Sequence, residues 1–153
     1  MPTFSATDQR TITIRAPRDQ VAQALGNPAR VREHLADELD SGELVDPTTI
    51  HYVRKLVEEK GVRFRGDYVV RYAIGDAGVT WASIGDGANM RSRGEAKLFA
   101  VGDGTTRVEF TQSIECDMEV NRLLAVVLRP IVEHKLKASI GGFLTKVKAS
   151  LER

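Results

Sequence analysis

The chain lacks the features that mark secreted, membrane-spanning or nucleic-acid-coating proteins. A single cysteine, Cys116, occurs in 153 residues, so no internal disulfide can form. The longest apolar run, residues 123–128, is far shorter than the ~20 residues that cross a bilayer. The 22 Lys and Arg residues nearly balance the 21 Asp and Glu residues, which argues against bulk nucleic-acid binding. We therefore expect a reduced, cytoplasmic protein without a transmembrane segment.

Aromatic residues are also few, but the remaining composition is that of an ordinary globular domain. Hydrophobic residues make up 42% of the chain and charged residues 28%. At ~150 residues per domain, this length predicts one domain, residues 1–153. No repeat, linker or low-complexity segment divides it.

The first third of the chain predicts one strand followed by two short helices. Residues 10–14 alternate apolar and polar side chains, as a half-buried strand does. Pro17 suits the first turn of a helix that includes residues 21–25. Pro28, preceded by an asparagine, repeats this pattern and begins a second short helix. Residues 37–47 are interpreted as a polar connection.

From residue 48 to residue 117 the apolar period is close to two, which predicts an antiparallel meander. The clearest strands are residues 62–74, 90–100 and 106–116, each with one apolar and one polar face. Glycine-rich turns separate the strands, because glycine adopts positive φ without strain. The apolar face of the first of these strands carries Val62, Phe64, Gly66, Tyr68, Val70, Tyr72 and Ile74.

After Asp117 the apolar spacing becomes helical and predicts a long C-terminal helix, with Pro130 as a kink or restart. A long antiparallel sheet with one apolar face must twist and curl around something, and this helix is the element long enough. The predicted fold is therefore α+β: a curved antiparallel sheet wrapped around a long C-terminal helix, with two short helices after the first strand.

Small residues on the facing surfaces allow two interpretations. Gly94 lies on the inward face of the sheet, and Gly141 and Gly142 lie in the helix. The small residues either let the helix pack closer to the sheet or leave a ligand cavity. We favour the cavity, because each glycine inside a helix costs ~1 kcal/mol relative to alanine.

The inward faces of the clearest strands carry no Asp or Glu, which counts against acid–base catalysis. The histidines share no metal-ligand spacing with Cys116, so we expect no metal and no cofactor. An apolar pocket with a few polar groups is typical of a small-molecule site. The expected ligand-cavity residues are Phe64, Tyr68, Tyr72, Trp81, Ser92, Gly94, Phe110, Gln112, Ala138 and Gly142.

The outward face of the sheet is rich in basic residues. It could contact anionic lipid headgroups, a protein or RNA, but acidic residues interrupt it and no aromatic residues are interleaved. A solvated sheet face is the favoured interpretation. The basic residues are Arg63, Arg65, Arg71, Arg91, Arg93, Lys97 and Arg107.

Three segments resemble one known superfamily. They are residues 12–21 (ITIRAPRDQV), residues 25–30 (LGNPAR) and residues 104–110 (GTTRVEF) before the long helix. They are similar to START-like (SRPBCC) helix-grip proteins, which include polyketide cyclases, lipid-transfer proteins and the birch pollen allergen. Within this superfamily the likeness is strongest to a family of carbon monoxide dehydrogenase subunits and to the coenzyme Q-binding proteins. The resemblance implies a sheet wrapped on a C-terminal helix with a hydrophobic ligand between them.

Three functions stay open from the sequence alone. The first is non-catalytic binding or carriage of a small lipid, isoprenoid or quinone-like ligand. The second is an enzyme of the polyketide cyclase or aromatase kind, and the third is a protein-interaction module with a filled core. The expected partner is a small hydrophobic molecule, with transient contact to a membrane surface or a protein as a further class; no nucleic acid is expected.

Overall fold

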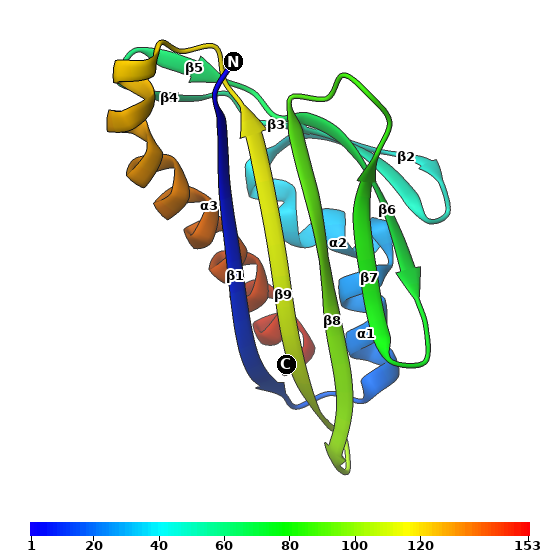
Figure 1. Ribbon diagram of the computed structural model, residues 1–153. Helices are drawn as coiled ribbons and strands as arrows, with labels where there is room; N and C mark the ends of the chain where they lie inside the picture. Colours follow the sequence, from blue (N-terminus) through cyan, green and yellow to red (C-terminus); the bar gives the residue numbers. More distant parts are fainter.

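The structure is built on a seven-stranded antiparallel sheet with its helices on one face (Figure 1). The computed structural model describes residues 1–153. The strands lie in the order β1-β9-β8-β7-β6-β3-β2, so β1 and β2 are the edges. Their bounds are β1 (Thr3–Ile14), β2 (Leu39–Asp46), β3 (Thr49–Arg54), β6 (Asp67–Ile74), β7 (Gly78–Ile84), β8 (Met90–Gly102) and β9 (Thr105–Asp117). A separate hairpin pairs β4 (Val57–Glu59) with β5 (Val62–Phe64).

The helices follow the predicted order. Two short helices, α1 (Arg18–Gly26) and α2 (Pro28–Leu35), come after the first strand, and α3 (Arg122–Leu151) ends the chain. Asn27 caps α2 by accepting a hydrogen bond from the Ala29 N–H at 3.1 Å, which satisfies one of the free amides at the helix start. The predicted α+β arrangement, with a curved sheet gripping the terminal helix, is confirmed. None of the helices is both long and apolar enough to cross a membrane.

Two local predictions are wrong, and a third is wrong in one of its two alternatives. Residues 37–47 are not a plain connection: a 3-10 turn (Ala36–Glu38) leads into the edge strand β2, whose polar residues lie mostly in solvent. Residues 62–74 are not one strand. The strand is interrupted at residues 65–66: β5 pairs with β4 in the separate hairpin, and only β6, from Asp67, joins the main sheet. Of the kink or restart predicted at Pro130, the restart does not occur, because α3 runs through this residue.

The core lies between the sheet and the helices. Strand β9 alternates buried and partly exposed residues along its whole length, which is the pattern of a sheet with one wet face. On α3, by contrast, the buried positions fall into two groups: Ala125 and Leu128, then Ile140, Leu144 and Val147. No residue between Leu128 and Ile140 is fully buried, so the middle of α3 is not tightly packed against the sheet.

Candidate ligand site between the sheet and the terminal helix

Two cavities lie between α3 and the sheet. The smaller has a volume of about 60 Å³ and lies among the aromatic side chains. The larger has a volume of about 260 Å³ and lies under the middle of α3. Arg54, Ile114 and Ser139 line both, so the two cavities meet at these residues.

The larger cavity is bounded by three parts of the chain. Val132 and Leu136 line it from the middle of α3, and Phe64 lines it from the β4–β5 hairpin. Met90 and Cys116, which are partners on β8 and β9, line it from the sheet. Burial raises the pKa of the Cys116 thiol to about 11, so this thiol is uncharged at neutral pH and behaves as a small apolar group.

A charged cluster lies where the cavities meet. Arg54, at the end of β3, donates hydrogen bonds to the Tyr68 hydroxyl at 3.1 Å and to Glu38 Oε1 at 3.0 Å. It also donates to Ser139 Oγ at 3.2 Å, while the Ser139 hydroxyl donates to the same Glu38 oxygen at 2.7 Å. The cluster joins the sheet, the 3-10 turn and α3, and its side chains can meet a polar group of a bound molecule.

Arg54 keeps its charge in this position. Burial alone would lower the pKa of Arg54, but the neighbouring Tyr68 and Glu38 outweigh it and raise the pKa. One carboxylate oxygen of Glu38 accepts hydrogen bonds from both Arg54 and Ser139. The cavities therefore border a permanent cation whose carboxylate partner comes from the 3-10 turn.

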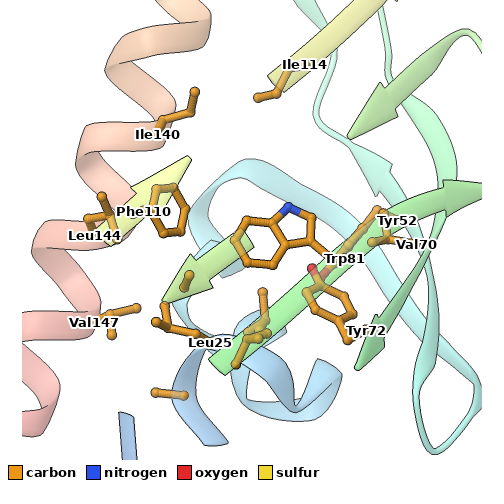
Figure 2. Close-up of a cluster of buried hydrophobic side chains, with 14 of the residues drawn as sticks. Leu25, Tyr52, Val70, Tyr72, Trp81, Phe110, Ile114, Ile140, Leu144 and Val147 are labelled. Carbon is orange, nitrogen blue, oxygen red and sulfur yellow. The ribbon is translucent and has the colours of Figure 1, made fainter. Parts of the chain in front are cut away.

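The aromatic side of the smaller cavity offers further hydrogen-bond donors (Figure 2). The hydroxyls of Tyr52 and Tyr72 are 2.8 Å apart in the core. One of them donates to the other, which leaves one hydroxyl proton without an acceptor in the protein. Burial is the main cause that raises the pKa of Tyr52 and of Tyr72, so both phenols stay protonated at neutral pH.

A second chain of hydrogen bonds crosses the sheet behind these tyrosines. The Trp81 indole donates to Gln112 Oε1 at 2.5 Å, and Gln112 Nε2 donates to Ser92 Oγ at 2.6 Å. Trp81 lies over Gly94, its partner on β8, where an added Cβ would be 2.6 Å from the indole ring. The space that Gly94 frees is therefore filled by Trp81.

The structure brings most of the expected cavity residues together. Phe64 lines the larger cavity, and Gly94 supports Trp81 without lining either. Ala138 and Gly142 lie on the exposed side of α3, outside both cavities, because the helix turns Ser139 and Ile140 toward the sheet instead. The expected residues that line the smaller cavity are Tyr68, Tyr72, Trp81, Ser92, Phe110 and Gln112.

Arg54 and Glu38 were not among the site residues predicted from the sequence. Arg54 has the same strand parity as Ile50 and Tyr52, both fully buried, so an arginine on an apolar strand face was the available signal. Glu38 has no such signal, because it comes from a turn and reaches the site only through the tertiary fold. No cluster of three or more His, Cys, Asp or Glu side chains could hold a metal ion.

Solved structures with the same architecture match nearly the whole chain. Zhui aromatase/cyclase from Streptomyces sp. R1128 matches with a TM-score of 0.67 and 14% identity, over 97% of this chain and 94% of its own. A START superfamily protein from Mycobacterium smegmatis matches with a TM-score of 0.66 and 10% identity, over 95% and 97%. Truncated norcoclaurine synthase from Thalictrum flavum matches with a TM-score of 0.60 and 11% identity, over 100% and 98%.

No model of a known protein family matches the chain, and no curated protein matches its sequence. At identities of 10–14% the likeness establishes the fold and leaves the activity to be argued from the site. The chain therefore has the same helix-grip fold as these structures.

Proposed function

We propose that this protein binds and carries a small hydrophobic ligand, of the lipid, isoprenoid or quinone-like class, between its sheet and α3. The apolar part of the ligand occupies the larger cavity, and a carbonyl, hydroxyl or carboxylate oxygen lies at Arg54. The observation that carries the proposal is the position of Arg54 at the junction of two cavities that are otherwise largely apolar.

The hydrogen-bond inventory supports a ligand that accepts hydrogen bonds. Arg54 can only donate, and the Tyr68 hydroxyl, which accepts from Arg54, keeps its own proton free. The Tyr52–Tyr72 pair has one further free proton. A ligand oxygen would satisfy donors that otherwise have no partner in the protein, and a buried donor without a partner costs about 1–3 kcal/mol.

The cavity volume supports a small ligand. The larger cavity, about 260 Å³, is slightly below the ~300–1,000 Å³ of typical ligand pockets. A compact quinone-like molecule or a single isoprenoid or acyl chain suits this volume better than a two-chain lipid does.

The first experiment is organic extraction of the purified protein followed by mass spectrometry, with an unrelated protein from the same host as control. The expected result is a stoichiometric apolar compound that carries at least one oxygen acceptor. If the extract contains no such compound, the proposal is tested by whether quinones, isoprenoids or fatty acids displace a hydrophobic fluorescent dye from the protein. Failure of all three classes to displace it contradicts the proposal.

Two variants on the same helix locate the binding site. Leu136→Trp places a large side chain in the larger cavity and should abolish dye binding, whereas Gly142→Leu adds a side chain on the exposed side and should leave it unchanged. Arg54→Met keeps most of the volume but removes the donors, so ligands with an oxygen acceptor should bind about tenfold or more weakly. Equal binding by Leu136→Trp and Gly142→Leu would show that the larger cavity is not the site.

A cyclase-like enzyme is the second candidate, favoured by the polar groups that converge on the smaller cavity. Tyr52 and Tyr72 can polarise a substrate carbonyl by donation but, since burial raises the pKa of both, they cannot remove a proton. Glu38 is a carboxylate that borders the larger cavity and is the candidate base. This function requires loss of turnover in both Tyr72→Phe and Glu38→Gln, and unchanged turnover in either variant contradicts it.

A further inference from the structure

The first two turns of α3 expose apolar side chains to solvent. Leu123 is 83% exposed, Val126 73% and Val127 51%, although the helix also buries Ala125 and Leu128 against the core. A helix that is apolar on its solvent side as well as its buried side is normally covered by another apolar medium.

The same end of the molecule carries further exposed apolar residues and an excess of positive charge. Leu56 and Val57, at the start of the β4–β5 hairpin, are 40% and 48% exposed, and this hairpin lies beside the first turns of α3 (Figure 1). Residues 55–64 and 119–137 together contain seven Lys or Arg and four Asp or Glu residues. The rest of the chain contains fifteen and seventeen, so these two segments carry a net positive charge and the remainder a net negative one.

We infer that this end of the protein docks on an anionic lipid bilayer, with Leu123, Val126 and Val127 inserted among the lipids and the surrounding Lys and Arg residues over the headgroups. Exposed apolar residues on a helix flanked by basic residues are the chemistry of interfacial membrane binding. Electrostatic attraction to anionic lipids adds to the binding for each Lys or Arg at the surface, which favours a bilayer over a neutral protein partner.

The rim of the larger cavity lies at this end. Val57, Glu59 and Lys135 line the cavity and are partly exposed, and Lys135 forms an ion pair with Glu59 across the gap between α3 and the hairpin. Docking therefore places the cavity rim close to the membrane, where a hydrophobic ligand can exchange without crossing water. This last point rests on the proposed ligand-binding function, whereas the docking itself does not.

The test is co-sedimentation of the purified protein with vesicles of phosphatidylcholine alone or with phosphatidylserine added. We expect binding to the anionic vesicles that is weakened by high salt, because salt screens the charges. The double variant Leu123→Gln/Val126→Gln should bind about a hundredfold more weakly, since each removed apolar side chain contributes about a tenfold factor. Arg122→Gln/Lys137→Gln should weaken binding to the anionic vesicles several-fold.

The matched control is Leu44→Gln/Val45→Gln, which replaces two exposed apolar residues on β2, at the opposite edge of the sheet. It should bind vesicles as the unchanged protein does. No binding to anionic vesicles, or equal binding by the helix variant and the control, overturns the proposal. A dimer in light scattering that the helix variant dissociates also overturns it, because the apolar surface would then contact a second copy. Vesicle binding is measured without ligand and dye binding without vesicles, so the two proposals fail separately.

Discussion

Two regions of the contact between α3 and the sheet, one toward the C-terminus of the helix and one under its middle, differ in how completely side chains fill them. At the packed end, which we define by Ile140, Leu144 and Val147, the helix lies against an aromatic cluster centred on Trp81 and Phe110 (Figure 2). At the open end, under residues 129–139, only partly buried side chains face the sheet and a cavity of about 260 Å³ remains.

The three glycines that suggested a cavity from the sequence, Gly94, Gly141 and Gly142, line neither cavity, although Gly66 lines the larger one. The glycine in the sheet, Gly94, lies at the packed end, and Gly141 gives room to the Arg10 guanidinium, 2.6 Å from the position of an added Cβ. The cavity lies where the buried spacing on α3 is interrupted and where the β4–β5 hairpin has left the sheet. A gap in helical burial is therefore the better indicator of a cavity here.

The largest expected effect is at the packed end. Phe110→Ala should lower the free energy of unfolding by about 3–5 kcal/mol, because Phe110 is buried and contacts both Trp81 and Phe143. Leu136→Ala at the open end should lower it by only about 1–2 kcal/mol, since Leu136 is only partly buried. Urea unfolding measures both, and similar losses would contradict the distinction between the two ends.

The next effect tests the role of Gly94. Gly94→Ala should lower the free energy of unfolding by about 2–3 kcal/mol, because its Cβ would lie 2.3 Å from the Thr111 carbonyl oxygen and 2.6 Å from Trp81. Gly142→Ala, on the exposed side of α3, should raise it by up to about 1 kcal/mol. If Gly94→Ala were neutral, the space beside Trp81 would be empty and the small-residue interpretation would hold after all.

A smaller effect concerns the charged cluster between the two ends. Glu38→Gln should lower the free energy of unfolding by about 1–2 kcal/mol, because Arg54 then loses its charged partner in a partly buried position. Adding Arg54→Met should restore part of this loss, since the effects of residues in contact are not additive. A double-mutant cycle measures the coupling, and additive losses would show that the pair is not coupled.

The smallest effect is on acid stability at the edge of the open end. Hydrogen bonds from Arg91 and then from Thr3 lower the pKa of Asp117 to about 2. The stabilisation is therefore complete above the ordinary value of 3.8 and is lost as the pH falls toward 2. Because Asp117 is partly exposed, we expect its ionisation to contribute only about 1 kcal/mol to the free energy of unfolding. Urea unfolding of Asp117→Asn between about pH 5 and pH 2 should show a shallower pH dependence than the unchanged protein, and identical slopes would contradict this assignment.

Local patterns predicted the fold well. The period of two along β8 and β9, the glycine turns and the helical spacing after Asp117 each depend on near neighbours in the chain, and the structure follows them. The failures have identifiable causes. β2 is an edge strand that lies mostly in solvent, so its composition resembles that of a loop, and the alternating pattern of residues 62–74 does not encode the pairing of β5 with β4 outside the main sheet.

The sequence by itself determined the order of the elements, the inward faces of the main strands and the family of folds, because backbone geometry and side-chain period are local properties. Only the tertiary structure decided where space remains and which charges meet. Arg54, Glu38 and Ser139 come from three separate elements, and Trp81 fills the space beside Gly94 across a strand pair. The volume of a cavity depends on every side chain that surrounds it, and that information is distributed over the whole chain.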